Sequence, residues 1–222
     1  MITPPAPARP FDAVLCDLDN VIRYYDMSRV AALEQAAGPA AGTTADVAYA
    51  PEVDLPLLLG RIDTAEWETA IVRGLAGRVP HALARDLAAA FARAPFRADE
   101  EVVALLRRAR KHLPLVLVTN ATLRLHDDLT SLGLADLADH VVGSAHVGAA
   151  KPDPVIYATA VERAGVPAGR CLFVDDRAEN VEAAVALGMT GVLFRGPADL
   201  RRALAPVLGE GGPQFCRECS FA

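Results

Sequence analysis

Lysine and asparagine are scarce in this sequence, and the few that occur are informative. Of the 22 basic residues, only Lys111 and Lys151 are lysine, and the asparagines are Asn20, Asn120 and Asn180. The abundance of Arg, Ala, Gly and Pro suggests GC-rich coding, under which lysine is kept mainly where arginine will not serve. A narrow site that needs a compact ammonium group is such a place. The scarcity therefore points to Lys151 and to the short motifs that contain the asparagines.

Several kinds of segment are also missing. The apolar runs are short and interrupted, so none approaches a membrane span, and the first residues lack the pattern of a secretory signal peptide. A net charge of -6 with a pI near 5.4 argues against nucleic acid as a partner. Cys16 and Cys171 lie in apolar runs and are expected to be reduced core thiols. We therefore expect a cytoplasmic protein with neither a membrane nor a nucleic-acid partner.

The histidines and the remaining cysteines do not predict a metal centre. The five histidines show no metal-ligand spacing. Cys216 and Cys219 form one Cys-x-x-Cys pair, which is half of a structural zinc site, and no second pair of suitable spacing exists. The pair follows the glycine-rich segment 209–213, so residues 209–222 are expected to be a flexible tail without a role in function.

Polar motifs follow three short apolar runs and stand in a fixed order along the chain. The runs are Ala13–Cys16, Leu115–Val118 and Cys171–Val174, and such runs are typical of buried parallel strands. The residues that come directly after them are Asp17-Leu-Asp19, Thr119-Asn120 and Asp175-Asp176, and Lys151-Pro152 lies between the last two motifs. Ligands of open parallel sheets bind beyond the carboxyl ends of the strands. The motifs therefore predict one site at that edge.

The residue types at this edge suit a metal ion and a phosphoryl group. Asp17 and Asp19 are two apart in an extended segment, so their side chains share a face, and Asp175 and Asp176 add two more carboxylates. Four converging carboxylates repel one another unless a divalent cation lies between them, and hard oxygen ligands favour Mg²⁺. The Thr119 hydroxyl, the Asn120 amide and the Lys151 ammonium suit phosphoryl oxygens. An aspartate is then available as nucleophile.

The rest of the chain predicts an α/β fold with a helical insertion. Residues 1–10 hold four prolines and no apolar period, and a first strand is expected over 11–17. Helical patterns follow over 27–37, 50–59, 64–74 and 81–94, with Asp63 or Thr64 capping the third of these helices. After residue 97 helices and strands alternate: helices 100–112, 123–132, 154–164, 178–187 and 198–204, and strands 115–118, 140–143, 171–174 and 191–194. Such alternation predicts a parallel sheet.

The ordered motifs resemble those of the haloacid dehalogenase-like (HAD) phosphohydrolases, and the resemblance runs from Phe11 to about Leu208. It implies a Rossmann-like three-layer α/β sandwich with a parallel sheet and a small α-helical cap domain. The core would comprise residues 1–20 and 98–208, the cap residues 21–97, and the tail residues 209–222. Asn20 stands where many relatives have glycine, and asparagine tolerates the left-handed backbone that the turn needs.

The resemblance also assigns a role to each motif residue. Asp17 would be the nucleophile that forms an aspartyl-phosphate, and Asp19 the acid and base that serves the leaving group and the water. Thr119 and Asn120 would hold the phosphoryl oxygens, and Lys151 would offset negative charge. Mg²⁺ would bind the Asp17 carboxylate, the main-chain carbonyl of Asp19 and Asp176, and it would bind Asp175 directly or through water.

The expected function is that of a Mg²⁺-dependent phosphatase for a small phosphorylated metabolite. An asparagine at position 20 and the run from Val174 to Val181 look most like sugar-phosphate phosphatases and the phosphatase domain of epoxide hydrolases. A phosphosugar mutase, a 2-haloacid dehalogenase and a non-catalytic scaffold are the alternatives. Phosphonate hydrolysis in this family needs a cap lysine, and residues 21–97 contain none. Arg23, Tyr24 and Tyr25 are candidates for contacts that select the substrate, because they follow Asp19 closely.

Overall fold

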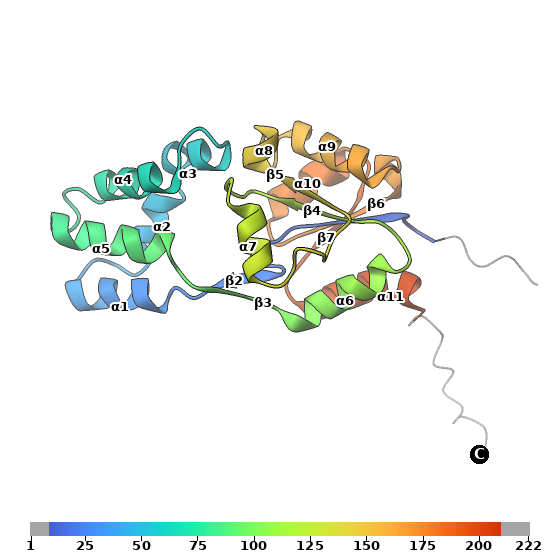
Figure 1. Ribbon diagram of the computed structural model, residues 1–222, viewed down its shortest axis with the longest axis horizontal. Coiled ribbons are helices and arrows are strands. Elements are labelled where there is room, and N and C mark those ends of the chain that lie inside the picture. Colours follow the sequence, from blue (N-terminus) through green and yellow to red (C-terminus); the bar gives the residue numbers. More distant parts are fainter. Residues whose placement is uncertain (1–8, 210–222) are drawn as a thin grey trace, which may run out of the picture.

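The computed structural model describes residues 9–209, which form a parallel sheet flanked by helices together with a helical insert (Figure 1). The sheet has five parallel strands in the order β5-β4-β1-β6-β7. Their bounds are β1 Ala13–Cys16, β4 Leu115–Thr119, β5 His140–Gly143, β6 Cys171–Asp175 and β7 Thr190–Leu193. The predicted α/β class with a parallel sheet is therefore confirmed.

Helices cover both faces of this sheet. On one face lie α6 (Glu100–Arg110) and α11 (Pro197–Leu208), and on the other lie α8 (Ser144–Val147), α9 (Pro154–Ala164) and α10 (Ala178–Ala186) (Figure 1). Alternate residues of β1 point to opposite faces. Val14 and Cys16 join the apolar cluster that includes α6 and α11 residues, while Ala13 and Leu15 join the cluster that includes α9 residues. The result is three layers with the sheet buried on both sides.

The insert after the first strand consists of helices α1 to α5, which enclose an apolar cluster of their own. Their bounds are α1 Ser28–Ala37, α2 Thr43–Ala48, α3 Pro51–Leu58, α4 Thr64–Gly74 and α5 His81–Ala92. Trp67 is buried in this cluster, as expected of a core residue. Asp63, rather than Thr64, caps α4, and it forms a capping box with Glu66. We call residues 28–92 the helical insert.

The sequence pattern predicts no strand on either side of the helical insert, and the structure has one at each end. Strands β2 (Arg23–Tyr25) and β3 (Phe96–Ala98) pair antiparallel, and through them the chain enters and leaves the helical insert. Each has three residues, too few for an alternating pattern to be recognised. Helix α11 also continues to Leu208, past the expected end at Leu204, and buries Val207 although Pro206 lies within it.

Two expectations about the chain as a whole can be compared with the structure, and a third cannot because it concerns residues that are not described. No helix within residues 9–209 is both long and apolar enough to cross a membrane. Cys16 and Cys171 are buried free thiols, as predicted. Cys216 and Cys219, together with the rest of the expected tail after Gly209, lie outside the described residues.

Candidate active site

The three central strands place polar side chains at one edge of the sheet. Asp17 follows β1, Thr119 ends β4 and Asp175 ends β6, and these strands are direct neighbours. Because the strands are parallel, their carboxyl ends meet at the same edge. Lys151, from the segment between α8 and α9, reaches the same place. All four residues are buried, so charged and polar groups are concentrated here away from solvent.

The Lys151 ammonium lies between two carboxylates. Its Nζ is 2.7 Å from Asp17 Oδ1 and 2.6 Å from Asp175 Oδ2. The main chain of Lys151 is fixed in turn by Asn120, whose Nδ2 donates to the Lys151 carbonyl at 3.0 Å and whose Oδ1 accepts from the Lys151 amide at 2.7 Å. Asn120 therefore positions Lys151, a role that the motif did not predict for it. Its second amide hydrogen is left for a ligand.

Three of the four predicted carboxylates converge. Oxygens of Asp17, Asp175 and Asp176 lie within 4.8 Å of one another. Burial raises the pKa of Asp17 to about 7 against the lowering effect of Lys151, and the nearby Asp175 charge raises it further. Burial and Asp175 also raise the pKa of Asp176. One ammonium does not neutralise three acids, so the donor set fits a hard divalent cation, whose charge would stabilise all three as carboxylates.

The fourth carboxylate, that of Asp19, is bound by an arginine. Arg23 donates from Nε to Asp19 Oδ1 at 2.5 Å and from Nη2 to Oδ2 at 2.9 Å. Its Nη1 donates to Asp128 Oδ2 at 2.9 Å. Arg23 is 2% exposed, so the idea that it contacts the substrate directly is not supported by its position. The structure thus separates Asp19 from the three acids that could share a cation.

Asn20, next to Asp19, has the backbone conformation that the sequence predicted. Its φ is +59°, and it is the one non-glycine residue among those described that lies in the left-handed region. Its side chain bonds to Asp176, which lowers the pKa of that carboxyl against the effect of burial. The asparagine therefore permits the turn after Asp19 and also supports the acidic group.

Supporting residues to which the sequence analysis assigned no role surround Asp175. Asn180 Nδ2 donates to both Asp175 oxygens, at 3.0 and 3.1 Å, and the Arg177 amide donates to Oδ1 at 2.9 Å. The Tyr157 hydroxyl donates to the Asn180 carbonyl at 3.0 Å. Because these bonds fix the rotamer of Asp175, they also fix the place of Lys151. The scarcity of asparagine was a signal for Asn180, whereas Tyr157 resembles any buried aromatic residue.

The Thr119 hydroxyl is the one polar group of the site without a partner. Thr119 is fully buried, and its Oγ1 makes no hydrogen bond to any residue between 9 and 209. A buried hydroxyl that is unsatisfied costs free energy, on the order of 1–3 kcal/mol in proteins. Such a group, at the sheet edge that Lys151 also reaches, suits an anionic ligand that would accept its hydrogen bond.

The helical insert contributes groups near the same edge. Partial burial of the Tyr49 side chain raises its pKa, and the charges of Asp19 and Asp54 raise it further. Burial raises the pKa of Asp54, on α3, to about 6, while the positive charge of Arg177 lowers it. A Cβ atom at Gly60, just after α3, would lie 2.9 Å from the carbonyl oxygen of Ala145 in α8, which follows the carboxyl end of β5. The insert therefore faces the edge of the sheet that carries the acidic group.

Comparison with known families identifies the class of protein. The family model described as a haloacid dehalogenase-like hydrolase matches residues 11–188. The chain belongs to the haloacid dehalogenase-like hydrolases. The match includes every site residue described above, and it agrees with the family resemblance of the motifs.

Parts of this chain are similar in sequence to curated proteins. The chain is 40% identical over 92 residues to phosphatase MT3486 of Mycobacterium tuberculosis, which is 40% of this chain and 42% of that protein. It is 39% identical over 101 residues to mouse haloacid dehalogenase-like hydrolase domain-containing protein 3, which is 45% of this chain and 40% of that protein. The matched segments thus span less than half the length of these curated relatives.

Solved structures show the same fold. A HAD family enzyme of Bacteroides thetaiotaomicron, crystallised with magnesium and inorganic phosphate, superposes with a TM-score of 0.61 at 20% identity and covers 81% of this chain and 92% of that chain. The L-2-haloacid dehalogenase RSc1362 superposes with a TM-score of 0.60 at 28% identity and covers 81% of this chain and 84% of that chain. Likeness of fold is therefore shared by a dehalogenase and by an enzyme crystallised with magnesium and phosphate, and it does not identify the reaction of this chain.

Proposed function

We propose that this hydrolase is a Mg²⁺-dependent phosphatase that acts on a small phosphorylated metabolite, with a sugar phosphate as one candidate. The observation that carries the proposal is the group formed by Asp17, Asp175 and Asp176. Displacement of a halide by a single carboxylate has no use for a cation cage around the nucleophile. Transfer of a dianionic phosphoryl group to a carboxylate does, because negative charge would otherwise accumulate at one place.

The proposed reaction has two steps. The Asp17 carboxylate attacks phosphorus, the bond from phosphorus to the leaving oxygen breaks, and Asp19 gives a proton to that oxygen. Water, deprotonated by Asp19, then attacks phosphorus and releases phosphate from the aspartyl-phosphate. Proton transfer of this kind is typically worth ~10²–10⁴ in rate. The first step leaves Asp17 phosphorylated and Asp19 without its proton, and the second step frees the Asp17 carboxylate and returns a proton from water to Asp19.

The remaining groups bind and orient the phosphoryl group. The Thr119 hydroxyl, unpartnered in the described residues, would donate to one phosphoryl oxygen, and Lys151 would offset charge on Asp17 and on the phosphate. Mg²⁺ would be held by Asp17, Asp175 and Asp176 and by the main-chain carbonyl of Asp19, and when bound it would supply positive charge to the phosphoryl oxygens. The helical insert would act as a cap over this edge and shield it from water.

The first test is release of inorganic phosphate from a panel of phosphorylated metabolites. We expect activity with Mg²⁺, none in excess chelator, and recovery when Mg²⁺ is returned. Asp17→Asn keeps the shape of the side chain but removes the nucleophile, so we expect a loss of at least ~10³-fold with an unchanged circular dichroism spectrum. Asp127→Asn, on the exposed part of α7 (Leu125–Ser131), is the matched control and should behave as the wild type.

The alternatives give different outcomes in the same assays. Full activity in chelator would contradict the role of Mg²⁺. Halide release from a 2-haloacid without phosphate release would identify a dehalogenase. Isomerisation of a sugar phosphate without net phosphate release would identify a mutase, and a protein inactive on every substrate would fit a scaffold.

A further inference from the structure

We propose that Arg23 is a positioning residue that holds the carboxylate of Asp19 in place and links it to the hinge of the helical insert. The inference rests on the proposed function, because it concerns the acid and base of that reaction. Arg23 lies too deep to bind substrate, and its side chain joins three segments: the loop after β1, helix α7 and the pair of strands β2 and β3.

The contact with Asp19 fixes an orientation as well as a position. Two guanidinium nitrogens of Arg23 donate to the two carboxylate oxygens of Asp19. A bidentate pair of this kind fixes the orientation of the carboxylate plane relative to the guanidinium plane. The main chain reinforces it, since the Arg23 amide donates to the Leu18 carbonyl and the Asn20 amide to the Arg23 carbonyl, both at 2.8 Å. Asp19 is itself 28% exposed, so without Arg23 its side chain could turn to other rotamers.

The far side of the guanidinium is held just as firmly. Its third donor binds Asp128 of α7, whose side chain is 22% exposed. The rings of Tyr25 and Phe96 lie 5.0 and 5.4 Å from the guanidinium carbon, within the range of cation–π attraction. These contacts on all sides fix the position of the Arg23 guanidinium. The fixed guanidinium then fixes the position of the Asp19 side chain.

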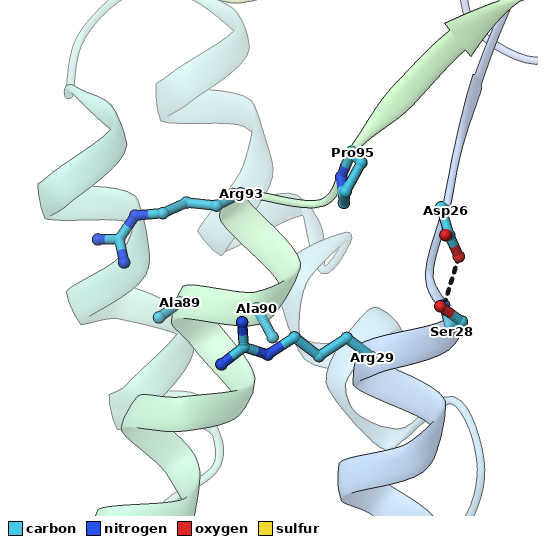
Figure 2. A pocket seen from close by; sticks show the side chains of 7 residues that line it. All are labelled: Asp26, Ser28, Arg29, Ala89, Ala90, Arg93 and Pro95. Atoms are coloured by element: carbon cyan, nitrogen blue, oxygen red, sulfur yellow. Dashed lines mark hydrogen bonds between the residues drawn. The ribbon is translucent and has the colours of Figure 1, made fainter.

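Arg23 also lies where the helical insert joins the sheet. It is the first residue of β2 and pairs with Ala98 of β3. Just past the other end of this strand pair, the Asp26 amide donates to the Pro95 carbonyl at 2.7 Å. Asp26 then accepts from the Ser28 amide at 2.9 Å, beside a pocket of about 210 Å³ between α1 and α5 (Figure 2). A movement of the insert about these strands would therefore shift Arg23 and, through it, Asp19.

The test compares Arg23→Met and Arg23→Lys with the wild type on two substrates, an alkyl phosphate and an activated aryl phosphate. The experiment measures kcat/KM, because this constant depends on the steps up to and including departure of the leaving group. An alkoxide needs the proton of a well-placed acid, and a misplacement of ~1 Å can cost on the order of 10²-fold. We expect a loss of that size for Arg23→Met on the alkyl phosphate, and at most a few-fold loss on the aryl phosphate.

The matched control is Arg97→Met. Arg97 is an exposed arginine of the same strand pair, opposite Tyr24, and it contacts neither Asp19 nor Asp128 in the structure. We expect wild-type kcat/KM on both substrates. Arg23→Lys keeps the charge but loses the bidentate geometry, so it should recover part of the loss on the alkyl phosphate.

A double-mutant cycle then separates positioning from a general structural effect. If Arg23 acts through Asp19, Arg23→Met should cause no further loss in an Asp19→Asn background. Asp128→Asn weakens only the contact on the far side of the Arg23 guanidinium. It should lower kcat/KM for the alkyl phosphate by less than Arg23→Met does, and it should leave the fold intact. Equal losses on both substrates, or losses that add in the cycle, would overturn the inference alone. A wild type that releases no phosphate from either substrate would contradict the proposed function and the inference together.

Discussion

At the scale of single residues, the site holds more negative charge than its one lysine neutralises. Lys151 and the carboxylates of Asp17 and Asp175 form a buried chain of ion pairs, and Asn180 satisfies the second side of Asp175. Asp176 adds a further acid that no cation in this group neutralises. The surplus negative charge and the unsatisfied Thr119 hydroxyl are features that a stable core would avoid. Both are accounted for if the site binds a cation and a phosphoryl anion.

Thr119 allows this interpretation to be tested at one atom. Thr119→Val keeps the shape of the side chain and removes the buried, unpartnered hydroxyl. We expect the free energy of unfolding, measured with denaturant in chelator, to rise by ~1 kcal/mol. The same variant should lower kcat/KM for a phosphorylated substrate by about tenfold, because one charge-assisted hydrogen bond is lost.

Thr119→Ser is the control for this prediction, because it keeps the hydroxyl. It should retain most of the activity and lose stability through the missing methyl group. If Thr119→Val were as active as the wild type, the hydroxyl could not bind the phosphoryl group.

At the scale of elements, the helical insert approaches helix α8 as well as being joined to the sheet through β2 and β3. The approach is made by Gly60, just after α3. A Cβ atom at Gly60 would lie 2.9 Å from the Ala145 carbonyl oxygen, and the φ of Gly60 is +67°. Glycine is therefore required both by the backbone conformation and by the close approach.

This contact predicts different effects for two similar substitutions. Gly60→Ala and Gly38→Ala both place a side chain at positive φ, and each should cost ~1–2 kcal/mol of unfolding free energy. Only Gly60→Ala also meets a neighbouring backbone, since nothing lies within 4 Å of a Cβ at Gly38. We expect Gly60→Ala to raise KM several-fold by displacing the insert, and Gly38→Ala to leave KM unchanged. Equal KM values for the two variants would show that this contact does not position the insert.

At the scale of the whole molecule, the buried acids make stability depend on pH when no metal is present. The pKa of Asp17 is about 7 in the folded protein and near 3.8 when unfolded, so between these values the folded state binds more protons. The free energy of unfolding must then fall as the pH rises from about 4 to 7. Asp176, whose pKa is also raised, acts in the same direction.

The prediction is that Asp17→Asn removes most of this pH dependence. In chelator, we expect the variant to exceed the wild type in unfolding free energy by ~1–4 kcal/mol at pH 8, and the difference to shrink toward pH 4. Denaturant titrations at several pH values measure it. Parallel pH profiles for the two proteins would contradict the raised pKa of Asp17.

The sequence by itself determined the parallel sheet, the helices around it and the list of polar residues at its edge. Apolar runs that end in polar residues are local patterns, and the parallel arrangement of strands brings their carboxyl ends together whatever the details of packing. The cap of α4, the buried thiols and the left-handed Asn20 are also local properties, and the structure agrees with each of these predictions.

Only the tertiary structure decided how the polar side chains are partnered. Asp19 and Asp17 share a face in the sequence pattern, yet Asp19 binds Arg23, which is anchored on Asp128 at a separation of 105 residues. Asn120 binds the main chain of Lys151, 31 residues away, and β2 meets β3 across the whole insert. Periodicity fixes the face on which a side chain lies. Its hydrogen-bond partner depends on which distant segment packs against that face, and no local pattern encodes that choice.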